Sequence, residues 1–131
     1  MPEIEFVTKA TELLIKLKEK GCPLCSPEIR PMSEKAFAAK GLCNPIVSVK
    51  IDGPVVPNDF AFDKDGMIYV LTGPNRGGKS VITCAVGIAF VMAQLGLPVC
   101  ADAHDDAALS AMLLENVQFL RRKMLISSAR Q

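Results

Sequence analysis

A glycine-rich segment between two apolar stretches constrains this chain more than any other feature. Residues Gly73 to Ser80 read GPNRGGKS and satisfy the pattern GxxxxGK[ST] without a gap. The apolar run Met67–Thr72 precedes this segment, and an apolar helical pattern begins at Val81. A strand, a glycine-rich loop and a helix in that order are the setting of a phosphate-binding loop, or P-loop. The sequence therefore predicts a P-loop, and the alternative is a glycine-rich turn that meets the pattern by chance.

The residue types in this loop suit the binding of a nucleoside triphosphate. Glycines let the backbone turn tightly, so that successive N–H groups and the positive end of the next helix face phosphate oxygens. Lys79 is expected to reach the β- and γ-phosphates, and the Ser80 hydroxyl is expected to bind Mg²⁺ together with ATP. The predicted phosphate-binding residues are Gly73, Pro74, Asn75, Arg76, Gly77, Gly78, Lys79 and Ser80.

The loop and its surroundings resemble the ATPase domain of the MutS family of DNA mismatch-repair proteins, whose loop typically reads TGPNMGGKS. Upstream, Gly41–Pro45 resembles the entry to that domain, and Val55–Asp59 resembles its short apolar–Pro–Asn segment. Downstream, Met92–Gly96 followed by Val99 and Ala101 resembles the family's MAxxG…VPA stretch. The resemblance is most specific over residues 71–80 and extends over about 41–101.

This resemblance implies an α/β fold, namely part of a three-layer P-loop NTPase of the ABC-ATPase type, preceded by an N-terminal helix. It implies ATP and Mg²⁺ as cofactors, ATP and ADP as ligands, and a pair of identical subunits in the parent family. DNA would be contacted by parts of the parent protein that are not in this chain. Val55 and Val56 would lie on the adenine side of the nucleotide.

Several positions depart from the family pattern. Val55 stands where the family often has an aromatic residue that stacks on adenine, Asn44 replaces a His, and Arg76 replaces the usual Met. No apolar strand ending in Asp-Glu follows Lys79, so the carboxylates that position Mg²⁺ and activate water are missing. We therefore expect this chain to bind Mg-ATP with little hydrolysis.

Two other functions are compatible with the loop. The chain could be a P-loop remnant that acts as a non-catalytic nucleotide-binding or protein-interaction module. The hydrophobic fraction of 50% against only 22% charged residues favours a partner that covers apolar surface. A small P-loop kinase is a third hypothesis, but no acceptor-site Asp or lid arginines stand at recognisable positions.

Composition limits the range of functions further. A chain of 131 residues indicates about one domain, and a net charge of +1 does not predict a DNA-binding face. No secretory signal is recognisable, and five cysteines, an odd number, favour reduced thiols in the cytoplasm. The CxxC pair Cys22/Cys25 is interpreted as ordinary thiols, with a zinc site as the alternative. Residues 81–101 carry no charge, but Gly96 and Pro98 argue against a membrane span.

The first half of the chain is expected to contain a helix and strands, and the family resemblance implies that these strands form an antiparallel edge. An amphipathic pattern predicts a helix over 3–20, and the prolines of 22–45 predict a connector with one short helix around 34–39. The division is therefore 1–40, an N-terminal helix and connector, and 41–131, a partial MutS-like P-loop ATPase domain. Strands are predicted at 46–51 and 60–62, and a turn at 63–66 would lead into the P-loop strand.

The second half is expected to be mainly helical. Residues 81–95 are apolar almost all round, which predicts a helix buried on most sides and ended by Gly96 and Pro98. Residues 97–101 predict a short buried strand. Asp102, Asp105 and Asp106 are interpreted as an acidic turn that caps a last helix over 107–125 rather than as catalytic carboxylates.

Overall fold

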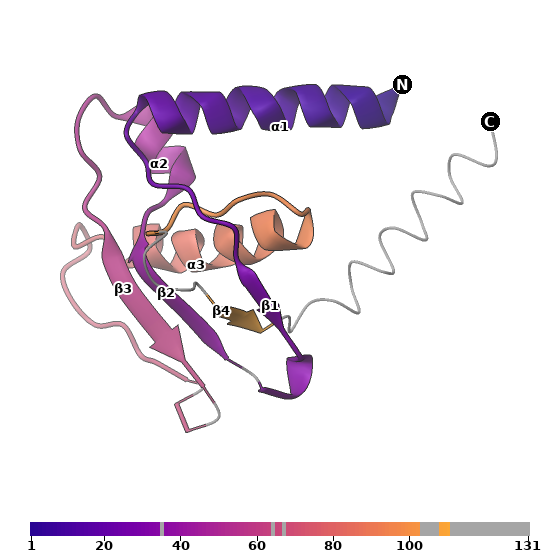
Figure 1. Cartoon of the computed structure of the whole chain (residues 1–131). Coiled ribbons are helices and arrows are strands. Elements are labelled where there is room, and N and C mark those ends of the chain that lie inside the picture. Colours follow the sequence, from indigo (N-terminus) through magenta and orange to yellow (C-terminus); the bar gives the residue numbers. More distant parts are fainter. Residues whose placement is uncertain (35, 64, 67, 103–107, 111–131) are drawn as a thin grey trace.

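A computed structural model describes residues 1–34, 36–63, 65–66, 68–102 and 108–110 of the chain. The described part mixes helices and strands (Figure 1). In chain order the elements are α1 (Pro2–Glu19), β1 (Glu28–Arg30), the 3-10 helix η1 (Met32–Glu34), β2 (Phe37–Leu42), α2 (Pro45–Lys50), β3 (Asn58–Phe62), α3 (Lys79–Gln94) and β4 (Ala108–Ser110). The α/β fold class predicted from the sequence is therefore confirmed, whereas the finer P-loop NTPase architecture stays a prediction.

The four strands form one sheet in the order β1-β4-β2-β3. β1 runs parallel to β4, and β2 runs antiparallel to both β4 and β3. The pairing of β2 with β3 is irregular between Ala39 and Leu42. Gly41 lies in this irregular stretch with a φ of 60°, and its N–H donates a hydrogen bond to Asp59 Oδ1 at 2.8 Å.

Aromatic rings join the sheet to α3, which lies against one face of it (Figure 1). Phe37 of β2 is completely buried and stacks on Phe62 of β3, with ring centroids 5.3 Å apart. Phe90 of α3 packs on the same Phe37 ring at 5.1 Å. Alternate residues of a strand face the same side, so Phe60 and Phe62 both contribute to this contact. The core of the described chain thus forms where α3 covers β2 and β3.

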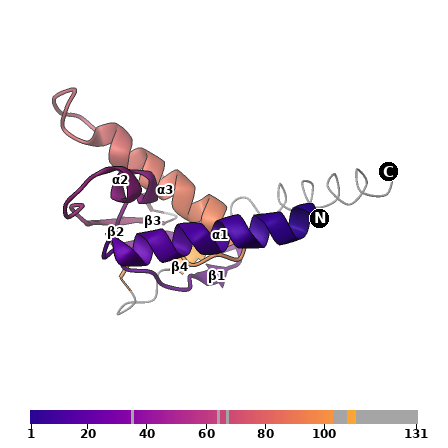
Figure 2. The same cartoon turned by 90° about the horizontal axis from the view of Figure 1, so that it is seen from above.

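Helix α1 is attached mainly at its C-terminal end. Leu17 is its one buried residue, and Lys20 Nζ bonds both Asp52 Oδ1 at 2.8 Å and the carbonyl of Ile51 at 3.2 Å, just beyond α2. Ile4 and Val7, near its N-terminus, are 62% and 60% exposed. In Figure 2 the N-terminal half of α1 accordingly extends past the end of α3.

Several elements match the sequence predictions. The N-terminal helix, the strand at 60–62 and the helix after the glycine-rich loop are all present as α1, β3 and α3. The turn after β3 is closed by Asp63, whose carboxylate accepts hydrogen bonds from the N–H groups of Asp65 and Gly66. Gly96, with a φ of 74°, ends α3 as expected. Among the described residues, no helix combines the length and apolar character needed to cross a lipid bilayer.

Two segments were predicted wrongly, because contacts with other residues override the pattern of the segment itself. Residues 46–51, predicted as a strand, lie largely in α2, since Asn44 caps the N-terminus of this helix and Pro45 occupies its first turn. Residues 34–39, predicted as a short helix, contain the end of η1 and the start of β2, which pairs with β3. The expected domain boundary after residue 40 falls inside β2, and the division into two domains stays a prediction.

The surroundings of the glycine-rich loop also differ from expectation. Residues 68–72, predicted as the P-loop strand, form no strand, because none of the described strands pairs with them, and Ile68 and Val70 are 87% and 84% exposed. Helix α3 is not buried on most sides, since Val81 and Val91 lie at the surface. Its buried positions are Ala85, Ala89 and Met92, which lie on the one face that contacts the rest of the described chain.

The structure describes only part of the segment 97–125, for which a short strand, an acidic turn and a last helix are predicted. In 97–101 the expected strand is reduced to one isolated bridge, between Val99 and Cys25, although Val99, Cys100 and Ala101 are buried as predicted. Residues 108–110 form β4 instead of the start of a helix. The rest of the predicted helix, and Asp105 and Asp106, lie outside the described residues.

Candidate functional site

The glycine-rich loop closes on itself immediately before α3. The N–H of Gly77 donates to the carbonyl of Pro74 at 2.9 Å, which makes a tight turn. Gly78 then adopts a left-handed conformation, with φ 79° and ψ 8°, and serves as the N-cap of α3. A side chain with a Cβ is disfavoured in this region, so glycine suits the junction of loop and helix.

The Lys79 side chain turns back into the loop. Its Nζ donates a hydrogen bond to the carbonyl of Gly73 and another to the carbonyl of Pro74, the latter at 3.1 Å. A fixed positive charge therefore lies among the backbone groups of the segment that precedes it. Phosphate oxygens are stronger acceptors for an ammonium group than neutral carbonyls, because both partners carry charge.

The N-terminus of α3 carries features of an anion-binding site. No side chain caps it by a hydrogen bond, and its first turn contains no acidic residue. The first N–H groups of a helix have no partner within the helix, and they carry a partial positive charge. Of the predicted residues, Lys79 is half-buried and the other seven are exposed: Gly73, Pro74, Asn75, Arg76, Gly77, Gly78 and Ser80.

Asn44 anchors the start of α3 to the rest of the fold. Its Oδ1 accepts hydrogen bonds from the N–H groups of Ile46 and Val47, and its Nδ2 donates to the carbonyl of Val81 at 3.0 Å. Asn44 is only 5% exposed, and these bonds are partly buried. In the sequence, Asn44 stands out only as a departure from a His; the signal that could have revealed its role is the Asn-Pro pair, a frequent start of a helix.

The two predicted adenine-side residues, Val55 and Val56, have different surroundings. Val56 is 76% exposed, whereas Val55 lines a cavity of about 450 Å³. The other described residues around this cavity are Lys20, Gly21, Cys22, Pro23, Gly41, Cys43, Ser48, Pro54, Pro57 and Asp102, and none of them belongs to the glycine-rich loop. A role of Val55 and Val56 in adenine recognition stays a prediction.

Three cysteines meet in the core, a feature that the sequence pattern did not reveal. Cys22, Cys43 and Cys100 are buried, while Cys25, the other half of the CxxC pair, forms the bridge with Val99. No group of three or more His, Cys, Asp or Glu side chains within the described ranges is arranged to hold a metal ion. The predicted zinc alternative therefore finds no support there; His104 lies outside the described residues.

Comparison with known proteins gives partial matches. No family model matches the chain. Endonuclease MutS2 of Streptococcus thermophilus is 48% identical over 54 residues, which is 41% of this chain and 7% of that protein. Endonuclease MutS2 of Lactococcus lactis subsp. cremoris is 42% identical over 66 residues, 50% of this chain and 8% of the relative. Endonuclease MutS2 of Streptococcus equi subsp. equi is 50% identical over 58 residues, 44% of this chain and 7% of the relative.

The chain thus spans less than a tenth of the length of the curated relatives it matches. Identities of 42% to 50% over the matched segments agree with the resemblance carried by the glycine-rich loop. Over this part of its length, the chain is related to the MutS family.

Proposed function

We propose that residues 73–80 bind the phosphates of Mg-ATP and of ADP. The observation that carries this proposal is the position of Lys79, whose ammonium group is held within the loop at the N-terminus of α3, where no side chain caps the helix. A positive side chain, a tight glycine turn and unpaired helix N–H groups together form a cradle for an anion. The relationship to MutS2 proteins supports a nucleoside triphosphate as that anion.

Each residue of the cradle has a distinct role in this proposal. The backbone of 73–78 surrounds the phosphates, Lys79 exchanges its loop carbonyls for phosphate oxygens, and Ser80 offers its exposed hydroxyl to Mg²⁺. The bound metal would neutralise phosphate charge. In a MutS-like parent protein, this ATP-binding portion would serve a DNA-binding, mismatch-repair ATPase that works as a homodimer, with DNA held by segments outside this chain.

A second candidate is a P-loop remnant that serves as a protein-interaction module. The observation that favours it is the exposed apolar segment before the loop, where Ile68, Val70 and Leu71 are 87%, 84% and 47% exposed. Contiguous exposed apolar surface marks interaction sites in many proteins. A partner that binds equally well with and without nucleotide would favour this candidate over the first.

Calorimetric titration of the folded chain with Mg-ATP and with ADP tests the proposed site. One site per chain is expected, and Lys79→Ala should weaken binding about ten- to a hundred-fold, because one charge-assisted contact contributes about 1.5–3 kcal/mol. Lys16→Ala, which removes the same charge from an exposed position on α1, should bind like the wild type. Equal affinity of the Lys79→Ala variant and the wild type would rule out the assignment.

A further inference from the structure

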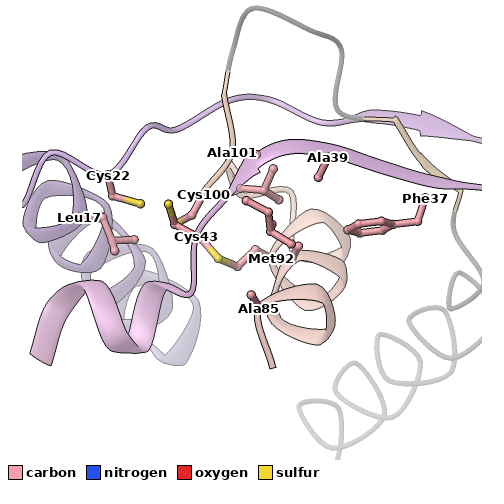
Figure 3. Close-up of a cluster of buried hydrophobic side chains, with 12 residues drawn as sticks. Leu17, Cys22, Phe37, Ala39, Cys43, Ala85, Met92, Cys100 and Ala101 are labelled. Atoms are coloured by element: carbon pink, nitrogen blue, oxygen red, sulfur yellow. The ribbon is translucent and has the colours of Figure 1, made fainter. Parts of the chain in front are cut away.

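The buried cysteines come from three segments that are far apart in sequence. Cys22 follows the end of α1, Cys43 follows β2, and Cys100 follows α3. They are 8%, 5% and 2% exposed, and Figure 3 shows them gathered between Leu17 and Met92 in the core. The N–H of Cys43 also donates to the carbonyl of Cys100 at 2.9 Å, so their backbones are direct neighbours. The fold therefore brings together thiols that the spacing of the sequence keeps apart.

The cavity of about 450 Å³ gives a small molecule access to this cluster. Cys22 and Cys43 both line it, together with Ser48 and Lys20. A cavity that holds several water molecules also has room for a hydroperoxide. Cys100 is not among the described residues that line the cavity and is 2% exposed.

The three thiols differ in how readily they ionise. Polar interaction with the neighbouring Cys100 and Cys43 side chains, and more weakly with Ser48, lowers the pKa of Cys22 well below its usual value, against the opposing effect of burial. Their position beside Cys22, and then burial, raise the pKa of Cys43 and of Cys100. The thiolate is the reactive form of cysteine. Cys22 lines the cavity and its pKa is lowered, so we assign the first reaction with a hydroperoxide to this thiol.

We propose that Cys22 is a site of reversible oxidation by hydroperoxides and closes an intramolecular disulfide with Cys43 or Cys100. This inference does not depend on nucleotide binding. In the first step the Cys22 sulfur attacks the terminal peroxide oxygen, the O–O bond breaks, and the alkoxide or hydroxide released takes up a proton. Cys22 becomes a sulfenic acid, and the peroxide is reduced by two electrons.

In the second step a neighbouring thiol attacks the Cys22 sulfur. The S–O bond breaks, an S–S bond forms, and the thiol proton leaves with the hydroxyl group as water. A Cys22–Cys43 disulfide would join the segment after α1 to the residue before Asn44, and a Cys22–Cys100 disulfide would join it to the segment after α3. A thiol reductant would reverse the reaction.

Mass spectrometry of the reduced full chain treated with hydrogen peroxide tests the proposal. Intact mass should fall by two hydrogen atoms, and peptide mapping should place the bond between Cys22 and Cys43 or Cys100. Cys84 is exposed on α3 and is the matched control. Cys84→Ser should form the bond as the wild type does, and Cys22→Ser should lose it. Oxidation at Cys84 or Cys25 with Cys22 unchanged would overturn the proposal.

A second measurement covers the case in which Cys22→Ser fails to fold. In the Cys43→Ser/Cys100→Ser variant the second step is blocked, so a sulfenic acid should accumulate on Cys22 and be trapped by dimedone. The wild type should remain reactive toward peroxide at a pH well below about 8.5, where an ordinary thiol in the urea-unfolded chain is protonated. No trapped Cys22, or the same loss of reactivity with falling pH in folded and unfolded chains, would refute the proposal.

Discussion

At the scale of single residues, two hydroxyl groups near the start of α3 have different surroundings, and this difference allows metal binding to be tested apart from helix structure. Ser80 is exposed beside the loop, whereas the Thr83 hydroxyl donates to the carbonyl of Lys79 at 2.9 Å. Ser80→Ala should bind nucleotide with little response to added Mg²⁺, because the hydroxyl ligand is lost while the backbone cradle remains. ATP titrations with and without Mg²⁺ measure this response.

Thr83→Ala provides the control for that experiment, since it removes a hydroxyl from the same helix outside the predicted site. It should keep the full response to Mg²⁺. If Mg²⁺ strengthens ATP binding to Ser80→Ala as much as to the wild type, Ser80 is not the metal ligand.

At the scale of elements, one glycine lies in an irregular part of a strand and another lies in the middle of a helix. Gly41 in β2 has a φ of 60°, and a Cβ added there would lie 3.0 Å from Asp102 Oδ2. Gly87 in α3 has helical backbone geometry, and a Cβ added there would meet no atom within 4 Å. The same substitution should therefore have opposite effects at the two positions.

Urea denaturation of the two alanine variants measures this difference. Gly41→Ala should lower the free energy of unfolding by about 1–2 kcal/mol or more, because an L-residue is strained at this φ and Asp102 must move. Gly87→Ala should raise it by about 0.5–1 kcal/mol, because alanine has the higher helix propensity. A change of the same sign in both variants would contradict the geometry of β2 described above.

At the scale of the whole molecule, nucleotide binding and hydrolysis should be separable. We predict that γ-phosphate release by this chain stays near the blank, since loss of catalytic groups that act together commonly costs several orders of magnitude. Asp102 is the acidic residue nearest in sequence after α3 within the described ranges, and its N–H donates to the carbonyl of Lys40 at 2.8 Å while its carboxylate lies against Gly41. Asp102 lines the cavity, and none of the described residues around that cavity belongs to the glycine-rich loop.

Steady-state phosphate release, measured with the wild type, Lys79→Ala and Asp102→Asn, checks this prediction. All three should give the same low rate. Turnover well above the blank that both substitutions abolish would show that Asp102 acts as a catalytic carboxylate and that the chain is a complete, shortened ATPase.

Local sequence determined the elements whose signals lie within a few residues. The pattern of Gly73–Ser80 and the apolar repeat after it sufficed to predict α3, and Gly96 its end, because helix start and stop depend on nearby backbone groups. The chemistry of the candidate site is equally local, since a tight turn, a lysine and a helix N-terminus come from consecutive residues. α1 and β3 follow from their periodicity for the same reason.

Only the tertiary structure decided features that depend on partners distant in the chain. Residues 68–72 carry a strand pattern, but a strand needs a neighbour with which to pair, and the described strands offer none. Residues 46–51 alternate like a strand, yet Asn44, held by Val81, starts a helix there. The meeting of Cys22, Cys43 and Cys100 has no trace in their spacing, because α1, β2 and α3 must first pack before their ends converge.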